Sequence, residues 1–393
     1  MHVHVKKNIN DEYYTRLYFG AWYRRSPYFN ATLRAGCKSY DIYNHQYLPG
    51  YYDDPIKEYW HILEHVSLWD VGVERTVEIS GPDASKMANL LTCRDLTKCA
   101  VGQGKYVLIT GEDGGIINDP VLLRIEENKW WLQLADSDAG LWVMGVAVNS
   151  GLNVKIDEPE VYPVQIQGPK SQKVLQKLCG DEILNVRYYW TLTTNLEGNI
   201  PVVISRTGWT GEVGYEITLR DASKGDQLWN LIMEAGKEFN IRPTPPCEIR
   251  RVEAGIFNWG QDMTFRDNPY QMMGLERLVE DQEADYIGKK ALEKIKKEGV
   301  KRKLVGLIVD GDELKSQLRE FWPIVEDGKQ IGHVTNAIWS PRLEKNIGYV
   351  WVPIEKADPG NKLNISSEQY GNMTGTTAAL PFHDPKKKVP LGK

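Results

Sequence analysis

Residues 79–91 read ISGPDASKMANLL, and residues 166–178 read IQGPKSQKVLQKL. In each stretch a short apolar run ends at a Gly-Pro pair, and a segment whose apolar residues recur at helical spacing follows. The same strand, turn and helix pattern therefore occurs twice, which predicts an internal duplication. We expect an α+β protein in which two related units share this pattern.

The segments around the first copy are predicted to form one small unit. A helix is expected at 55–69, ending before Asp70, because its apolar residues recur close to the helical period. Asp113-Gly114 lies between two apolar runs and tolerates the positive φ angles of a tight hairpin, so Asp119 is expected on the returning strand. The other expected elements are a helix at 83–91 and strands at 76–80, 106–110, 116–125 and 130–135.

A change in composition follows the second copy. From residue 303 short β runs alternate with Gly and Pro turns, which predicts a small C-terminal β barrel. We therefore expect domains at 1–150, 151–300 and 301–393, and a solvated, lysine-containing tail at 383–393. The expected strands are 161–167, 188–192, 202–205, 215–219, 304–309, 330–335, 346–350 and 362–365, and the expected helices are 171–178, 225–239, 246–258 and 286–299.

Composition favours a protein that acts on small molecules. The 393 residues exceed what one core usually holds, and a net charge of -5 gives no cationic field for nucleic acid or an anionic membrane. Five cysteines without a CxxC pair indicate reduced thiols in the cytoplasm. No signal peptide is predicted within residues 1–10, and no apolar run is long enough to span a membrane.

Aromatic residues crowd the stretch from residue 13 to residue 60 without a helical or strand period. The whole chain has 13 Trp and 20 Tyr against only 7 Phe, and the first two combine a flat face with a polar group. Two interpretations stay open. The stretch is either an irregular arm that lines a pocket or a cover over the surface.

One short motif is typical of a metal site. Residues 61–65 read HILEH, which matches the H-x-x-E-H order of inverted zinc peptidases and places His61 and His65 on one helical face. No third ligand is evident, so we predict an amphipathic helix and no metal, with a zinc hydrolase as an alternative. Nucleophile motifs, dinucleotide loops and phosphate loops are missing, which argues against hydride and phosphoryl transfer.

Two glycine-rich segments remain, EDGGIINDP at 112–120 and RTGWTGEVGYE at 206–216. Their small residues would let a flat ligand approach the backbone, although two ordinary hairpins explain the pattern equally well. Here the sequence resembles the aminomethyltransferase family, the T-protein of the glycine cleavage system and its relatives. The matching words, in the family's order, are GGIINDP (114–120), RTGWTGEVGYEI (206–217), RRVEAGIFNWG (250–260), YIGKKAL (286–292) and GHVTNAIWSPRLEKNIGYV (332–350).

Other words resemble the dimethylsulfoniopropionate demethylase branch of this family more than the T-protein itself. They are YNHQYLP (43–49), EYWHILEHVSLWDVGVERTVEISGPDA (58–84), LLTCRDL (90–96) and NKWWLQLADSD (128–138). The T-protein usually reads Asp-Val-Ser-His-Met where residues 70–74 here read DVGVE. The resemblance implies two related folate-enclosing α+β units, a C-terminal barrel, and tetrahydrofolate as methyl acceptor.

The resemblance also implies roles for individual residues. Asp119 matches the catalytic carboxylate near the reactive end of the pterin. Tyr106 matches a folate-contacting tyrosine, Glu216 the glutamate that binds the pterin ring, and Arg251 the arginine near the folate tail. Trp209 replaces a tyrosine of the T-protein, agrees with the demethylase branch, and is expected to contact both folate and donor.

The donor site is implied to include Tyr43 and Asn44. The faces of Tyr43 and Trp209 suit a cationic donor, because cation–π attraction contributes about 0.5–2 kcal/mol. A carboxylate at Asp119 would stabilise the charge that forms on the attacking amine or accept its proton. Thr218 stands where the demethylase branch carries a tyrosine, which leaves the exact donor open.

The predicted activity is transfer of a methyl group from dimethylsulfoniopropionate or a similar donor to tetrahydrofolate. Alternatives are aminomethyl transfer from a lipoyl carrier protein, O-demethylation of a methoxy compound, and folate binding without turnover. The expected partner is a small-molecule methyl donor, the chain is compatible with a homodimer, and neither nucleic acid nor a membrane is expected.

Overall fold

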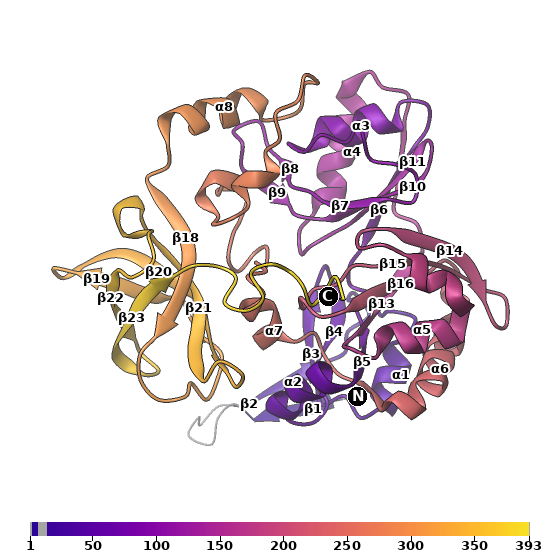
Figure 1. Cartoon of the computed structure of the whole chain (residues 1–393), viewed down its shortest axis with the longest axis horizontal. Coiled ribbons are helices and arrows are strands. Elements are labelled where there is room, and N and C mark those ends of the chain that lie inside the picture. The colour runs from indigo at the N-terminus through magenta and orange to yellow at the C-terminus, as the bar shows by residue number, and fades with distance from the viewer. Residues whose placement is uncertain (1, 7–13, 393) are drawn as a thin grey trace.

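The computed structural model describes residues 2–6 and 14–392 (Figure 1). Residue 13, where the predicted aromatic arm begins, lies outside the described residues, as do residues 1 and 7–10 of the N-terminal stretch and Lys393 of the predicted tail. Within the described chain, no helix combines the length and the apolarity that crossing a membrane requires. All five cysteines are free thiols.

The first copy of the repeat forms a five-stranded sheet covered by two helices. In spatial order its strands are β12 (Lys155–Asp157), β6 (Thr76–Ser80), β11 (Lys129–Gln133), β10 (Val121–Glu126) and β7 (Gly104–Tyr106). Helices α3 (Ala84–Leu91) and α4 (Ala139–Ser150) pack on it. Their common core includes Val77, Met87, Trp130 and Val143, each nearly inaccessible to solvent.

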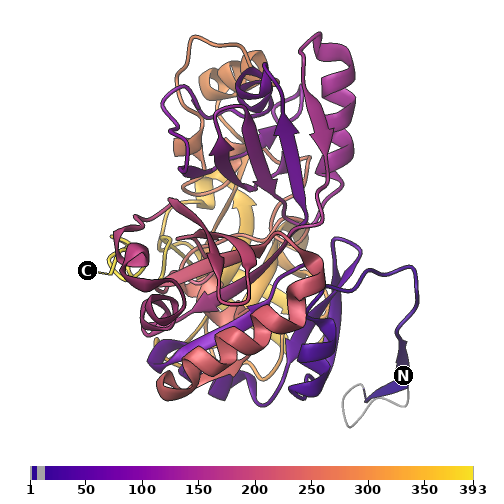
Figure 2. The ribbon, with the colours of Figure 1, turned by 90° about the vertical axis from the view of Figure 1, so that its right-hand side faces the viewer.

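The second copy forms a six-stranded sheet beside the first (Figure 2). Its strands, in spatial order, are β14 (Thr191–Leu196), β15 (Ile200–Ser205), β16 (Gly214–Leu219), β13 (Tyr162–Gln167), β5 (Val66–Asp70) and β17 (Ile241–Pro243). Helices α1 (Phe29–Arg34), α5 (Ser171–Cys179) and α6 (Gly225–Gly236) belong to the same unit. Only β5 and β17 pair in parallel within this sheet.

The C-terminal quarter of the chain contains a closed six-stranded barrel, as predicted. Its strands, in spatial order, are β18 (Arg302–Val309), β21 (Lys345–Pro353), β20 (Lys329–Ser340), β19 (Trp322–Glu326), β22 (Lys362–Ser367) and β23 (Gly371–Ala378). Helices α7 (Glu248–Glu253) and α8 (Lys289–Glu298) lie on the segment that leads into it. The remaining elements are β1 (His2–Lys6), β2 (Tyr14–Tyr18), β3 (Ser39–Tyr43), β4 (Gln46–Tyr51), α2 (Pro55–Glu64), β8 (Ile109–Thr110) and β9 (Ile116–Asn118).

The repeated Gly-Pro turn has the same geometry in both units. Gly81 and Gly168 have φ angles of +118° and +121°, values that side chains with a Cβ rarely adopt. A Cβ at Gly81 would lie 2.8 Å from the carbonyl oxygen of Asn153, and one at Gly168 would lie 2.5 Å from that of His65. The predicted fold class, two related α+β units followed by a barrel, is confirmed.

Several predicted boundaries are wrong for local reasons. The helix expected at 55–69 ends at Glu64, because residues 66–70 are all buried and form β5, an interior strand of the second sheet. The helix expected at 246–258 covers only Glu248–Glu253, and Gly255 beyond it has a φ of +68°. Helix α4 was not predicted, because it is apolar almost all round and shows no helical period.

The chain also crosses between the two sheets. Strand β5 precedes the first sheet in sequence but pairs in the second, and β12 pairs with β6 in the first sheet after residue 151. The domain boundaries at 150 and 300 therefore stay a prediction, although the barrel begins near the second of them.

Candidate active site

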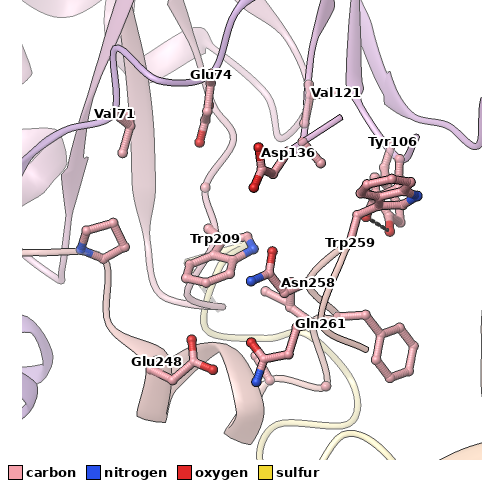
Figure 3. A pocket seen from close by; sticks show the side chains of 18 of the residues that line it. Val71, Glu74, Tyr106, Val121, Asp136, Trp209, Glu248, Asn258, Trp259 and Gln261 are labelled. Carbon is pink, nitrogen blue, oxygen red and sulfur yellow. Dashed lines mark hydrogen bonds between the residues drawn. The ribbon is translucent and has the colours of Figure 1, made fainter. Parts of the chain in front are cut away.

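A cavity of about 1120 Å³ lies where the two α+β units and the barrel meet. This volume slightly exceeds the roughly 300–1,000 Å³ that is usual for ligand pockets, so the cavity has room for an extended ligand beside a second small one. Figure 3 shows that Glu74, Asp136, Trp209, Asn258 and Trp259 surround its centre.

Asp119 faces this cavity from a bend and not from a strand. The expected strand 116–125 is interrupted after β9, and β10 begins at Val121, because Pro120 has no N–H for a ladder. The facing strand breaks at the same level, where Val107 N donates to Pro120 O at 3.1 Å. The prediction that Asp119 follows the Gly114 turn is confirmed, since β8 and β9 pair as a hairpin, but its place on a strand is wrong.

Neighbouring side chains hold this bend in position. The Asn118 amide donates to Ala135 O at 3.1 Å and to Ser137 Oγ at 2.7 Å. Gly115 is required at the turn, because a Cβ there would lie 1.9 Å from the carbonyl oxygen of Phe265. The backbone on both sides of the carboxylate is therefore fixed before any ligand arrives.

The Asp119 carboxyl group is only half satisfied. Its Oδ2 accepts a hydrogen bond of 2.9 Å from the Tyr106 hydroxyl, whereas its Oδ1 is buried with no hydrogen-bond partner among the described residues. Burial raises the pKa of Asp119 to about 7, and the bond from Tyr106 opposes this rise. A carboxyl group that titrates near neutrality with one free oxygen is suited to accept a proton.

Glu216 lies on β16 in the second sheet and is bonded at both oxygens. Oε1 accepts from the Gln165 amide at 2.8 Å, and Oε2 accepts from the Thr207 hydroxyl at 2.7 Å. Gln165 is opposite Glu216 in the register of β13 and β16, which explains the contact. The strand geometry therefore fixes this carboxylate at the cavity wall.

Sequence reasoning did not identify Glu74, which also lines the cavity. The Gln165 amide donates to Glu74 Oε1 at 3.3 Å, so one amide connects Glu74 and Glu216. Burial and the negative charge of Glu216 raise the pKa of Glu74 well above its usual value. The sequence feature that could have identified Glu74 is its position in DVGVE, where it replaces the methionine of the T-protein.

Aromatic side chains supply the flat walls. Tyr43, at the end of β3, and Trp209 both line the cavity, as does Trp259, whose indole N–H donates to Ile116 O at 2.8 Å. The aromatic arm thus reaches the pocket through Tyr43. Most of its other aromatic residues do not, since Tyr40 and Tyr47 pack in a separate cluster.

Two predicted site residues lie behind the cavity wall instead of lining it. The Arg251 guanidinium is fully buried, donates to Glu248 Oε2 at 2.8 Å and to Asp262 Oδ2 at 2.7 Å, and lies 5.4 Å from the Trp209 ring centroid. Asn44 is buried, and its backbone N–H donates to Asp136 Oδ1 at 2.7 Å. Both residues position side chains that do line the cavity.

Thr218, where the pattern of the demethylase branch is broken, is fully buried on β16. Its hydroxyl accepts from the Gln133 amide at 3.1 Å, and Gln133 lines the cavity. The Gln133 amide oxygen has no partner among the described residues. The smaller residue at 218 therefore acts on the cavity through Gln133.

The histidine pair does not form a metal site in the described chain. His61 Nε2 is 3.0 Å from Val66 O, and His65 Nδ1 is 2.8 Å from Lys170 Nζ. No group of three His, Cys, Asp or Glu side chains suited to a metal occurs among the described residues. These contacts give no support to the zinc hydrolase alternative.

The predicted tail is solvent-exposed at residues 385–388, as expected, but it also borders the site. Lys386 and Lys387, with Pro385, line the cavity from the C-terminal segment. This second role was missed, because a lysine run indicates solvent exposure but carries no information on what the segment crosses.

Comparison with known proteins agrees with this architecture. The family model described as the GCVT N-terminal domain matches residues 28–283, and the glycine cleavage T-protein C-terminal barrel domain matches residues 302–384. The chain belongs to the glycine cleavage T-protein family. Membership confirms the predicted tetrahydrofolate-dependent one-carbon transferase, with tetrahydrofolate as co-substrate.

Relatives in the family carry two different names. Dimethylsulfoniopropionate demethylase DmdA of Ruegeria pomeroyi is 35% identical over 88% of this chain and 93% of its own length. The aminomethyltransferase of Halothermothrix orenii is 30% identical over 91% and 99%. The crystal structure of the glycine cleavage system aminomethyltransferase T from Bartonella henselae matches with a TM-score of 0.82 at 22% identity, over 92% of this chain and 98% of that one.

The cavity fits a reduced folate. Gln133, Gln165 and Asp119 each line it and each has a buried oxygen without a hydrogen-bond partner in the described part of the chain. A reduced pterin offers N–H donors in a flat ring, which is what these acceptor oxygens require.

Proposed function

We propose that this protein transfers a methyl group from dimethylsulfoniopropionate, or a similar donor with a cationic sulfonium or ammonium group, to tetrahydrofolate. The observation that carries the proposal is the free Oδ1 of Asp119 at the cavity, on a bend that its neighbours hold rigid. The proposed catalytic residue is Asp119. Tyr106, Trp209 and Glu216 contact folate, and Tyr43 with Trp209 contacts the donor.

The charge distribution supports a cationic donor. The cavity lining contains more acidic than basic residues: Asp41, Glu74, Asp119, Asp136, Glu216 and Glu248 against Arg277, Lys386 and Lys387. Trp209 and Tyr43 add π faces, and a desolvated cation over such a face gains up to about 2 kcal/mol. A neutral methoxy compound has no positive charge to interact with the acidic residues or with the aromatic faces, so a sulfonium or ammonium donor suits the cavity better. The name of the demethylase relative is consistent with a sulfonium.

When bound, tetrahydrofolate supplies the nucleophilic amine that receives the methyl group. Glu216 and Gln165 are placed to bind in-plane N–H groups of a pterin, because β13 and β16 present them side by side. The Tyr106 hydroxyl is already committed to Asp119, so its ring face remains for the folate. Arg251 supports Trp209, and Asn44 orients Asp136.

The step itself is a direct displacement. The donor's carbon–sulfur bond breaks with its electron pair left on sulfur, which becomes a neutral thioether, and a carbon–nitrogen bond forms on the acceptor amine. The proton that the amine loses passes to Asp119 Oδ1. Asp119 must therefore be ionised at the start, and its carboxylate also stabilises the positive charge on the nitrogen during attack.

A donor screen tests the proposal. Purified protein is incubated with tetrahydrofolate and dimethylsulfoniopropionate, a quaternary ammonium, a methoxy aromatic, or an aminomethylated lipoyl carrier protein, and methyl-tetrahydrofolate and methylene-tetrahydrofolate are measured. We expect methyl-tetrahydrofolate from the sulfonium most rapidly. Turnover with the carrier protein alone would establish aminomethyl transfer and reject the proposal.

A cytoplasmic setting stays our prediction, supported by the five free thiols.

A further inference from the structure

Three basic side chains line a cavity whose other charged residues are acidic. They are Arg277, Lys386 and Lys387. None of the three forms an ion pair with another described residue, and the guanidinium of Arg277 donates to the Gly274 carbonyl oxygen. Both lysines keep solvent-exposed surface at the edge of the cavity, and desolvation together with the positive charge of Arg277 lowers the pKa of Lys387. Adjacent cations without a counter-ion form a site that favours an anion.

The two lysines belong to a segment that is fixed at both ends. We call residues 380–392 the C-terminal strap. His383 N donates to Glu253 O at 2.9 Å, at the end of α7, and Arg206 Nη2 donates to Pro390 O at 3.4 Å, beside the second sheet. Figure 1 shows the strap leaving the barrel and crossing the molecule, and in Figure 2 the C-terminus lies at the left edge. The lysines are therefore held across the cavity.

The strap's own acidic residue does not neutralise them. Asp384 Oδ2 accepts from Val389 N at 2.8 Å, and Asp384 O accepts from Lys387 N at 2.9 Å. The side chain of Asp384 therefore closes a local turn, and among the described residues it forms no ion pair with either lysine amine. The turn fixes the backbone while both ammonium groups remain available.

Arg251 does not supply the cation that an acidic folate tail requires. Its guanidinium is fully buried and already bonded to Glu248 and Asp262. The family's barrel model ends at residue 384, so Lys386 and Lys387 lie beyond the part of the chain that matches it. Arg277, Lys386 and Lys387 are the cations that line the cavity and could face such a tail.

We propose that Lys386 and Lys387, together with Arg277, form a subsite for the oligo-γ-glutamyl tail of a polyglutamylated folate. The inference rests on the proposed function, since it takes folate as the occupant of the cavity. Each added glutamyl residue brings one more carboxylate, and the strap presents its cations where such a tail would leave the cavity. The preference for the longer tail depends on salt, because partly exposed charges are screened.

The test compares two folates on four proteins. The dissociation constants of monoglutamyl and triglutamyl tetrahydrofolate are measured by calorimetry at low and high salt for wild type, Lys386→Gln/Lys387→Gln, Arg277→Gln and Lys388→Gln. Lys388 is the matched control, because it lies on the strap but does not line the cavity. Wild type and Lys388→Gln are expected to bind the triglutamyl form about three- to tenfold more tightly, from ion pairs of modest strength.

The double variant is expected to bind both forms equally, with its affinity for the monoglutamyl form within about twofold of wild type. Arg277→Gln is expected to lose part of the preference. The inference is overturned if wild type shows no preference, if the double variant keeps it, or if Lys388→Gln loses it equally. Triglutamyl preference without methyl transfer from any donor would reject the proposed function and leave the subsite standing, whereas methyl transfer without preference would do the reverse.

Discussion

Asp119 and Glu216 face the same cavity from the two related units, yet their surroundings differ. Glu216 is bonded through both oxygens to Gln165 and Thr207, while Asp119 is bonded through one oxygen to Tyr106. The difference follows from backbone geometry. Glu216 lies inside a regular strand whose neighbours supply donors at fixed register, and Asp119 lies at a bend where two ladders are interrupted.

This contrast separates recognition from chemistry. A carboxylate with all its donors in place is held rigid and can bind a ligand edge without moving. Burial raises the pKa of both carboxyl groups, but only Asp119 has a free, desolvated oxygen that is ready to take up a proton. Each of the two related units thus places one carboxylate at the cavity. Of these two, only Asp119 has a buried oxygen without a hydrogen-bond partner among the described residues.

The strongest test of the contrast is Asp119→Asn. The amide cannot accept the proton or stabilise the charge on the amine, so kcat is expected to fall by about 10²–10⁴-fold. The dissociation constant for tetrahydrofolate should change little, because Glu216 and Gln165 remain. Single-turnover methyl transfer and folate binding are measured together, and near-normal turnover in this variant would remove Asp119 from the mechanism.

Glu216→Gln is expected to do the opposite. Loss of a charge-assisted hydrogen bond should weaken folate binding by about 10- to 100-fold, while kcat at saturation changes much less. Glu74→Gln is the matched control. Because burial and the negative charge of Glu216 raise the pKa of Glu74, the cavity favours its neutral form, and replacement by a neutral amide should lower folate affinity only slightly. A kcat collapse in Glu216→Gln would show that the two carboxylates do not divide their roles as proposed.

The sequence predicted the parts of the site that follow from pattern. The two Gly-Pro turns indicated the duplication because only glycine fits their φ angles, and the Asp113-Gly114 turn placed Asp119 near a hairpin. The bend itself was missed, since a single proline in an apolar run looks like a continuous strand until the facing ladder is known.

What the sequence did not predict depends on contacts between distant segments. Arg251 could not be told apart from a ligand-binding arginine without Glu248 and Asp262 around it. Lys386 and Lys387 were predicted only to be solvated, because their proximity to the cavity depends on how the barrel packs against the two α+β units. Glu74 was marked by a departure from the T-protein pattern, but its link to Glu216 through Gln165 required the register of β13 and β16.

The pH dependence of the reaction gives a smaller effect. With the pKa of Asp119 raised to about 7, the reactive carboxylate is lost as pH falls, so the rate should drop about tenfold for each pH unit well below this value. The measurement is single-turnover rate against pH with folate saturating. A flat profile down to pH 5 would show that Asp119 is not the titrating group.

Tyr106→Phe sharpens the same prediction. The Tyr106 hydroxyl bonds the ionised carboxylate and so lowers the pKa of Asp119 relative to burial alone. Its removal should move the acid limb to higher pH and reduce the rate at pH 7 by a few fold, with the alkaline plateau largely restored. A shift toward lower pH would contradict the assigned bond.

The smallest expected effect is on stability, because the buried carboxylate of Asp119 should destabilise the folded protein when it is ionised. Burial raises the pKa of Asp119 above its unfolded value, so the folded protein binds the extra proton, and stability is lost as pH rises from about 4 through about 7. Asp119→Asn cannot ionise and should therefore exceed wild type by about 1–3 kcal/mol at pH 8, after allowing for solvent screening. Thermal unfolding of both proteins at pH 5 and pH 8 measures this, with the gap expected to widen at the higher pH. Burial also raises the pKa of Glu216, but hydrogen bonds from Thr207, Ser205 and Gln165 oppose that rise, so Glu216→Gln should gain less stability than Asp119→Asn. Equal stabilisation of both variants would contradict the proposed difference between the two carboxylates.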